Sequence, residues 1–255
     1  GIVKKTFIRS WYSFLKMQSK VAPKMHNIIS PSKSSKNDIQ KYFHIDASKI
    51  HVIPNGIDTG IFKPNPMISK KPFKLITTAS ADVPLKGLDF TLRAIAIAKD
   101  KYPLINLVVI GKPRSGGHTE RLISKLGIDE FVSFKTNLTN QEVSDEYASS
   151  QIAIVSSLYE GFGFPVGEAM ACAVPLIATD VASIPEITGP YAEMIAPESH
   201  EDIFNSLDNI FQNYDHYMKK ANLGRDHILQ NFSWSVIANS YIDHISSILT
   251  SHADI

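Results

Sequence analysis

The chain has 255 residues, of which 44% are hydrophobic and 20% are charged, a composition that supports one large or two modest folded domains and excludes a disordered chain. Its formal net charge of +1 hides an uneven distribution, because the first 37 residues hold eight lysines and arginines and no acid, whereas the remainder carries a charge of −7. Because the chain is not basic throughout, we do not expect it to bind nucleic acid. Cys172 is the single cysteine, and no apolar run reaches the roughly 18 residues of a membrane span, so we expect a cytoplasmic protein.

Residues 3–25 are predicted to form a basic amphipathic helix, because apolar side chains recur at helical spacing between the cations. Such a helix packs on its own domain or lies on a membrane surface, and the spacing alone leaves both open. We expect a short strand over His26–Ser30, a polar helix over Ser34–Phe43 and another strand from His51. The proline-rich stretch Phe62–Pro66 has the composition of a linker.

From Phe73 onward, short apolar runs alternate with helical stretches, which is typical of a parallel α/β sheet. The expected strands are Lys74–Thr78, Asn106–Ile110, Val132–Lys135, Ile152–Ser156 and Leu176–Ala178. The expected helices are Leu88–Lys101, Thr119–Leu126, Asn140–Ser149 and Val166–Ala173. Because crossovers between parallel strands are right-handed, a doubly wound, Rossmann-like sheet is the economical topology, with ligands at the carboxyl ends of its strands.

The C-terminal part is predicted to be helical. Thr139 and Ser199 each precede an acid by three residues, the spacing of a capping box at the start of a helix. After a cap at Ser233, apolar residues recur at helical spacing, so we expect residues 232–255 to form a C-terminal helix. Its apolar stripe needs a partner surface, and the N-terminal segment is one candidate.

The glycine-rich stretch Ser156–Ala171 follows an apolar strand and carries the residues best suited to ligand binding. Its glycines allow close approach of the backbone to a ligand, and Pro165 suits the first position of a helix. We expect the N–H groups of residues 163–167 to be unpaired and to face one point, which favours an anion such as a diphosphate.

Glu160 and Glu168 stand on either side of this turn, separated by seven residues. Ionised carboxylates only accept hydrogen bonds, which suits them to the hydroxyls of a sugar or a ribose. Taken alone, the same stretch is equally compatible with two solvated surface acids beside a turn shaped by glycines.

Six segments, in order, resemble the retaining glycosyltransferases of the GT-B fold, in particular the large family (family 4-like, group 1) with a Glu-x7-Glu motif in its nucleotide-sugar-binding domain. They are Val52–Asp58 with Phe62–Pro64, Pro84–Gly87, Glu160–Pro165, Glu168–Pro175, Ile184–Glu186 and Phe232–Trp234. The resemblance covers residues 28–249. It implies a donor-binding Rossmann-like domain over residues 64–231, preceded over residues 1–63 by a remnant of the acceptor domain with the linker.

By this resemblance, Glu168 binds the ribose hydroxyls, Glu160 with the backbone of residues 162–164 holds the donor sugar, and Lys86 lies on the diphosphate. Lys86 and Glu160 are the expected catalytic residues. The implied donor site comprises Lys86, Glu160, Gly161, Phe162, Gly163, Phe164, Pro165, Val166 and Glu168. No metal or other cofactor is expected, because a lysine and helix N–H groups can stabilise a departing diphosphate.

Two departures from the family pattern bear on function. Members usually carry an Arg a few residues before the Lys, and here Ser80, Ala81 and Asp82 occupy those positions, which puts donor affinity and donor type in doubt. Arg114 is a candidate to replace this missing cation. The alternative is that Arg114 is an exposed loop residue that contacts no ligand. A complete GT-B enzyme also has two Rossmann-like domains, and this chain has room for one.

The sequence therefore predicts a retaining, metal-independent glycosyltransferase that moves a sugar from a nucleotide-diphosphate sugar to an acceptor hydroxyl, with this chain mainly as the donor-binding domain. The expected acceptor is a carbohydrate or a lipid-linked molecule, and peripheral association with the inner membrane face, through the missing acceptor domain, stays open. Two alternatives are a non-catalytic nucleotide-sugar-binding module that needs a partner acceptor subunit, and a GT-B phosphorylase or epimerase. The loop Thr136–Leu138 is where we expect the nucleobase.

Overall fold

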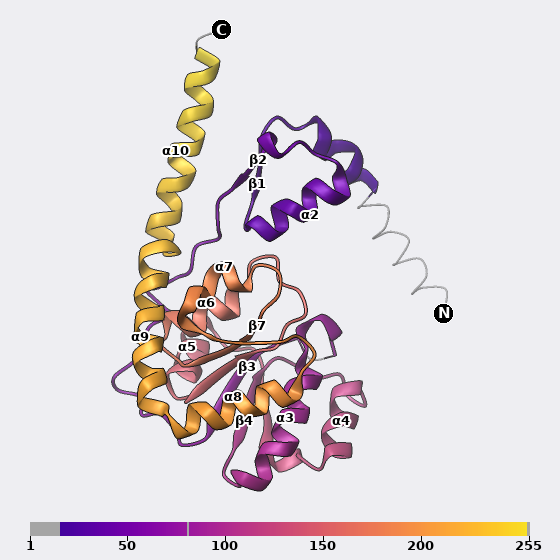
Figure 1. The fold of residues 1–255 in the computed structure, drawn as a ribbon, viewed down its shortest axis with the longest axis vertical. Coiled ribbons are helices and arrows are strands. Elements are labelled where there is room, and N and C mark those ends of the chain that lie inside the picture. Colours follow the sequence, from indigo (N-terminus) through magenta and orange to yellow (C-terminus); the bar gives the residue numbers. More distant parts are fainter. Residues whose placement is uncertain (1–15, 81, 254–255) are drawn as a thin grey trace. The chain divides into compact units, whose positions relative to one another are not determined.

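The computed structural model describes residues 16–80 and 82–253 and divides into two compact units at Pro54 and Asn55 (Figure 1). This division falls a little before the boundary at residue 63 drawn from the sequence, because the linker stretch packs with the second unit. Most of the helix expected over residues 3–25 lies outside the described residues, although residues 16–21 are helical.

The first unit places two short parallel strands beside a helix. After the 3-10 turn η1 (Ala22–Lys24), its elements are β1 (Ile28–Ser30), α2 (Lys33–Phe43), η2 (Ala47–Lys49) and β2 (Ile50–Val52). Ile29 lies opposite His51 in the parallel pair. Helix α2 begins where the Ser32 side chain accepts the N–H of Ser35 at 3.0 Å, and this cap satisfies one of the unpaired donors of the first turn. The predicted helix and both strands are confirmed within two residues at their ends.

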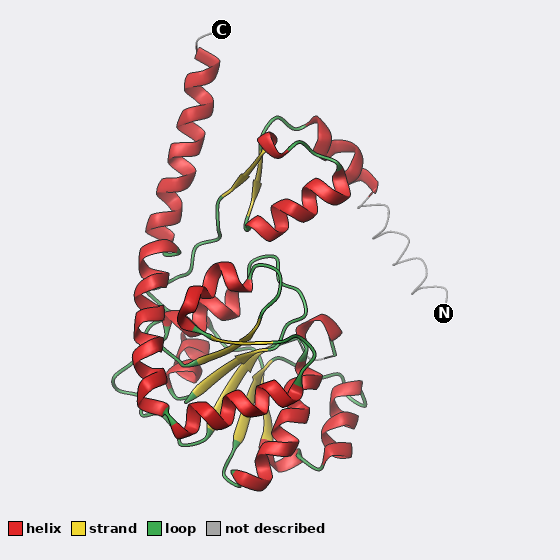
Figure 2. Cartoon of the chain, in the orientation of Figure 1, coloured by secondary structure: helices red, strands yellow, loops and turns green. Residues whose placement is uncertain are grey.

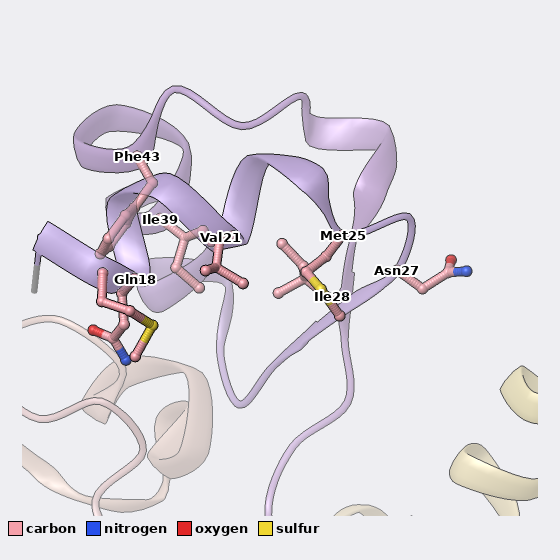
Figure 3. A pocket seen from close by; sticks show the side chains of 9 residues that line it. Gln18, Val21, Met25, Asn27, Ile28, Ile39 and Phe43 are labelled. Atoms are coloured by element: carbon pink, nitrogen blue, oxygen red, sulfur yellow. The ribbon is translucent and has the colours of Figure 1, made fainter. Parts of the chain in front are cut away.

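An apolar groove of about 530 Å³ lies on this first unit (Figure 3). Its walls come from the helical residues 16–21, from η1 and from α2, and they include Val21, Met25, Ile28 and Phe43. Val21 and Met25 are close to half exposed. Parallel sheets are usually covered on both faces, and at this groove apolar side chains of the described residues remain open to solvent.

The second unit is built on a six-stranded, entirely parallel sheet (Figure 2). Its strands are β3 (Lys74–Thr78), β4 (Asn106–Ile110), β5 (Val132–Lys135), β6 (Ile152–Val155), β7 (Leu176–Thr179) and β8 (Glu193–Ile195). The first five match the strands expected from the apolar runs to within a residue. The edge strand β8 was not predicted, because it has only three residues and begins with a glutamate.

Helices cover both faces of this sheet, as the alternating pattern predicts. They are α3 (Leu88–Lys101), α4 (His118–Leu126), α5 (Asn140–Ala148), α6 (Phe164–Ala171), α7 (Ile184–Thr188), α8 (His200–Gln212) and α9 (Tyr214–Asn231). On one face, α3 and α8 bury side chains such as Leu92 and Leu207. On the other face, α6 and α9 bury Met170 and Ile228. The capping box at Thr139 is confirmed, with the Glu142 N–H donated to the threonine hydroxyl.

The order of the strands is β5-β4-β3-β6-β7-β8, so the chain runs outward from β3 to β5 and then returns to the other side of β3. The reversal lies between β3 and β6. Loops that follow these two strands leave the same edge of the sheet on either side of a crevice, which is where doubly wound folds bind ligands. In this chain, the loop after β3 carries Lys86 and the loop after β6 carries Glu160.

The C-terminal helices α9 and α10 (Trp234–Ala253) are separated by a break at Phe232 and Ser233. Residue Ile57 lies against this break and donates its N–H to the Phe232 carbonyl oxygen at 2.7 Å. Of the apolar stripe expected on α10, Ile237 is buried. Packing of this stripe on the N-terminal segment stays a prediction. Within the described ranges, none of the helices combines the length and the apolar content that crossing a bilayer requires.

Candidate functional site

The loops after β3 and β6 touch directly at Gly87. The 3-10 turn η3 (Pro84–Lys86) ends at this glycine, whose φ of +63° lies in the left-handed region. A Cβ atom at this position would lie 1.8 Å from the carbonyl oxygen of Ser156, so only glycine fits. A second link is the hydrogen bond from the Leu158 N–H to the Leu85 carbonyl oxygen, at 2.8 Å. The two loops therefore form one continuous surface at the switch point of the sheet.

Lys86 and Glu160 meet on this surface. The Lys86 ammonium lies 2.7 Å from Oε1 of Glu160, and the same oxygen accepts a hydrogen bond from the Ser157 hydroxyl at 2.8 Å. The side chain of Glu160 is 11% exposed and that of Lys86 is 30% exposed, so the carboxylate is buried behind the ammonium. An ammonium carries three donors, and Glu160 uses one of them. The Lys86 side chain can thus hold a second anion without releasing the first.

Two serines that the sequence analysis missed fix the turn around Glu160. Ser157 holds the carboxylate, as described above, and Ser183 donates its hydroxyl to the carbonyl oxygens of Glu160 at 2.8 Å and of Phe162 at 2.9 Å. Both serines are at least 97% buried. Buried hydroxyls that satisfy backbone carbonyls hold a loop rigidly. No sequence pattern marks Ser183, because it lies on a different loop of the sheet.

The start of α6 corrects two expectations. Gly163 is the N-cap, with a φ of +95°, and the helix begins at Phe164, so Pro165 takes the second helical position rather than the first. The N–H groups of Val166 and Gly167 both bond to the Gly163 carbonyl oxygen, because the helix starts earlier than predicted. Of residues 163–167, Pro165 has no N–H, and only the N–H groups of Gly163 and Phe164 lack an acceptor among the residues that the structure describes.

Glu168 lies in the second turn of α6, partly buried beside the same crevice. Burial raises the pKa of its carboxyl to about 7. Its oxygens accept no hydrogen bond from any residue that the structure describes. Tyr147 lies near it, and burial, with the charge of Glu168, holds the pKa of the phenol well above its usual value. A half-buried carboxylate without a donor is suited to receive the hydroxyls of a ligand.

The two aromatic residues of the turn have different environments. Phe162 is 95% buried and packs in the core against Phe232, whereas the Phe164 side chain is 45% exposed. Their rings meet edge to face with centroids 5.2 Å apart. Phe162 thus fills the core beneath the turn, and Phe164 is the aromatic side chain that the turn presents to solvent.

Other residues singled out in the sequence lie around the crevice. The loop Thr136–Leu138 follows β5, at the same edge of the sheet, and is largely exposed. Arg114 lies in an exposed loop, where its backbone contacts Asp82 through the N–H and Gly117 through the carbonyl oxygen. Ala81 lies outside the described residues. Over residues 16–80 and 82–253 no cluster of three or more His, Cys, Asp or Glu could hold a metal ion.

Comparison with known families gives two matches along the chain. Residues 62–227 match the family described as Glycosyl transferases group 1, and residues 3–60 match Glycosyltransferase Family 4. Among individual relatives, the MMP alpha-(1->4)-mannosyltransferase of Mycolicibacterium hassiacum is 32% identical over 92% of this chain and 57% of its own length. The phosphatidylinositol N-acetylglucosaminyltransferase gpi3 subunit of Schizosaccharomyces pombe is 24% identical over 76% of the chain and 42% of its own length. The chain thus spans about half the length of these relatives.

Solved structures show the same fold. Anabaena Alr3699/HepE, in complex with UDP and glucose, has a TM-score of 0.81 at 18% identity over 91% of this chain and 66% of its own. The C-terminal domain of a glycosyl transferase group 1 family protein (LpcC) from Francisella tularensis has a TM-score of 0.61 at 26% identity and is covered along its whole length by 70% of this chain. Since the group 1 match spans well over half of the chain, this protein belongs to the glycosyl transferases group 1 and contains a Rossmann-like half of the GT-B fold.

Proposed function

We propose that this chain is the donor-binding part of a retaining, metal-independent glycosyltransferase. The reaction would transfer a sugar from a nucleotide-diphosphate sugar to an acceptor hydroxyl. The observation that carries this proposal is the convergence of Lys86, Glu160 and Glu168 on the crevice between β3 and β6. A cation, two carboxylates and two unpaired backbone N–H groups are the set that a sugar joined to a nucleoside diphosphate requires.

The leaving group determines the role of Lys86. When the bond between the sugar and the diphosphate breaks, negative charge gathers on the terminal phosphate, and donors already aimed at that position stabilise it most. The Lys86 ammonium has two donors left after its bond to Glu160, and the N–H groups of Gly163 and Phe164 lie at the positive end of α6. These groups supply the charge stabilisation, so the reaction needs no metal ion.

The two carboxylates orient the donor. In this proposal Glu168 accepts the ribose hydroxyls, and Glu160 accepts hydroxyls of the donor sugar. The bond from Lys86 fixes Glu160 in place beside the diphosphate. The acceptor hydroxyl attacks from the face that the diphosphate leaves, which retains the anomeric configuration, and its proton passes to the departing phosphate. No side chain is then required as a general base.

The donor site can be tested by calorimetric titration of the purified chain with UDP-, GDP- and ADP-sugars. Glu168→Gln is expected to weaken binding of the preferred sugar nucleotide by about 1–3 kcal/mol, the usual cost of losing a hydrogen bond to a charged group. Glu130→Gln, at an exposed site before β5, is the charge-matched control and is expected to bind like the wild type. Equal affinity of Glu168→Gln and the wild type would contradict the assignment.

A second candidate is a binding module without activity of its own. In this candidate the chain, which spans 57% of the mannosyltransferase relative, binds the sugar nucleotide and acts only together with an acceptor domain. Incubation of the chain alone with a sugar nucleotide and candidate acceptors separates the two proposals. Formation of a glycoside would exclude the pure binding module, whereas tight donor binding without turnover, restored by an added acceptor domain, would establish it.

The charge of the N-terminal segment indicates which kind of acceptor or surface the protein contacts. Residues 1–37 carry eight cations and no acid, which suits an anionic or lipid-linked acceptor, or a peripheral contact with an anionic membrane on the cytoplasmic side. Vesicles with and without anionic lipid provide the test, by co-sedimentation of the whole chain at physiological salt. Preferential binding to the anionic vesicles is expected, and equal sedimentation with both would remove the membrane contact.

A further inference from the structure

Asp82 lies in the loop between β3 and η3. The family resemblance leads us to expect a phosphate-binding arginine at the positions just before it. Its backbone φ of +62° lies in the left-handed region, which residues other than glycine, asparagine and aspartate rarely adopt. Such a conformation persists only where other contacts hold it. The contacts of this side chain therefore bear on the function of the loop.

The Asp82 side chain is tied to the start of helix α4. Its Oδ2 accepts the Arg114 N–H at 2.8 Å, and its Oδ1 accepts the Thr119 N–H at 2.8 Å. In return, the Asp82 N–H donates to the Thr119 hydroxyl at 3.1 Å. Thr119 is 99% buried, so the partner side of this link is fixed. Three hydrogen bonds thus join the loop after β3 to the loop after β4.

This link caps α4 from a distance. The N-cap residue of α4, Gly117, has no side chain to accept the N–H groups of the first turn, and Asp82 supplies that acceptor instead. The carboxylate also occupies the positive end of the helix, where an anion would otherwise bind. In this chain, α4 is therefore closed to a phosphate by the protein itself.

The same link holds the segment that carries Lys86. Residues 82–87 are fixed at Asp82 by α4, at Leu85 by the Leu158 N–H and at Gly87 by the close contact with Ser156. Lys86 lies between the last two of these points and reaches Glu160. Of the three, the bond made by Asp82 is the one that depends on a charged side chain.

We propose that Asp82 is a positioning residue: it holds the loop after β3 so that Lys86 faces the diphosphate. This inference rests on the proposed function, because it takes the crevice to be the donor site. The alternative is a purely electrostatic role, and the two have opposite consequences. Loss of a negative charge near a diphosphate strengthens binding, whereas loss of positioning weakens it.

Asp82→Asn keeps the size of the side chain but replaces one acceptor oxygen with a donor. The matched control is Asp89→Asn: Asp89 lines the same small cavity as Asp82 and also contacts α4, through a 2.5 Å bond to His118. Dissociation constants for UDP and GDP, and for uridine and guanosine, are measured by calorimetry. Asp82→Asn is expected to weaken the preferred nucleoside diphosphate at least fivefold and its nucleoside less than twofold. Asp89→Asn is expected to bind the diphosphate as tightly as the wild type or more tightly.

A double-mutant cycle with Lys86→Ala identifies the residue through which Asp82 acts. In the Lys86→Ala background, Asp82→Asn is expected to change diphosphate affinity by less than twofold, because the group that it positions is gone. Equal losses in both backgrounds, or tighter binding by Asp82→Asn, would overturn the inference. Should Asp82→Asn fail to fold, Asp82→Glu keeps the charge but displaces the carboxylate from the Arg114 and Thr119 N–H groups, so it is expected to weaken diphosphate binding as well, and unchanged affinity there would overturn the inference. Failure of the wild type to bind UDP, GDP or ADP would overturn the proposed function itself, and the role of Asp82 with it.

Discussion

The ammonium of Lys86 lies 2.7 Å from the carboxylate of Glu160, across the gap between the loops that follow β3 and β6. These residues are far apart in the chain, and the parallel order of the sheet makes the two loops neighbours. The contact joins the group proposed to hold the diphosphate to the group proposed to hold the sugar. In the proposed complex, binding of the leaving group and binding of the transferred group are coupled through this ion pair.

Lys86→Ala is expected to separate the two parts of the nucleotide. The ammonium contacts the phosphates in the proposed complex and does not contact the base or the ribose. Affinity for UDP or GDP is therefore expected to fall about tenfold or more, while affinity for the nucleoside changes little. Calorimetric titration of both ligands checks this, and equal losses for nucleotide and nucleoside would move Lys86 away from the phosphate.

Glu160→Gln is expected to distinguish sugar binding from nucleotide binding. The substitution weakens the acceptor for the donor sugar and at the same time frees Lys86 from its charged partner. Binding of the sugar nucleotide is expected to weaken while binding of the free nucleoside diphosphate is retained or strengthened. The ratio of the two dissociation constants is the quantity to measure, and a ratio equal to that of the wild type would contradict the role of Glu160.

The raised pKa of Glu168 predicts a pH dependence of stability. Its carboxyl has a pKa of about 7 in the folded chain against an ordinary value of 4.5, so between these values the folded state binds more protons than the unfolded state. The contribution of Glu168 to the free energy of unfolding therefore falls as pH rises from 4.5 to 7 and is level above that. Glu168→Gln is expected to gain stability relative to the wild type across this window. Urea denaturation at a series of pH values measures the difference, and a difference that does not change with pH would contradict the burial of Glu168.

Gly87→Ala tests the contact between the two loops. Its Cβ would collide with the Ser156 carbonyl oxygen in a backbone conformation that is already unfavourable. We therefore expect the free energy of unfolding to fall by about 3 kcal/mol or more. Gly116→Ala is the matched control, because Gly116 has nearly the same φ, +64°, and nothing within 4 Å of its Cβ position. That variant is expected to lose only about 1–2 kcal/mol, the strain of the left-handed conformation. Chemical denaturation measures the free energy of unfolding of both variants, and an equal decrease in the two would contradict a collision with Ser156.

Strands β3, β4, β6 and β7 were predictable from the sequence because each is a short, mostly buried apolar run, whereas the edge strand β5 is only half-buried and was found from its alternating apolar residues. The positions of Glu160 and Glu168 on either side of a glycine-rich turn after a strand were also predictable, and their role in a donor site stays a prediction. The start of α6 was placed two residues too late, and the unpaired N–H groups were overcounted for that reason.

Contacts across the switch point could not be predicted in the same way. Ser183 reaches the turn of Glu160 from the loop after β7, and Asp82, in the loop after β3, reaches Thr119 in helix α4. Both contacts depend on strand order and on the exact path of a loop, which local periodicity does not encode. The sequence marked Asp82 only as a departure from a family pattern, and its partners came from the fold.

The most direct test of the donor site is a crystal structure of this chain with UDP or GDP, whichever raises its melting temperature more. We expect a diphosphate within hydrogen-bonding distance of the Lys86 ammonium and the Phe164 N–H, with the ribose hydroxyls on Glu168. A nucleotide bound elsewhere, or one whose diphosphate lies at the start of α4 in place of Asp82, would contradict it.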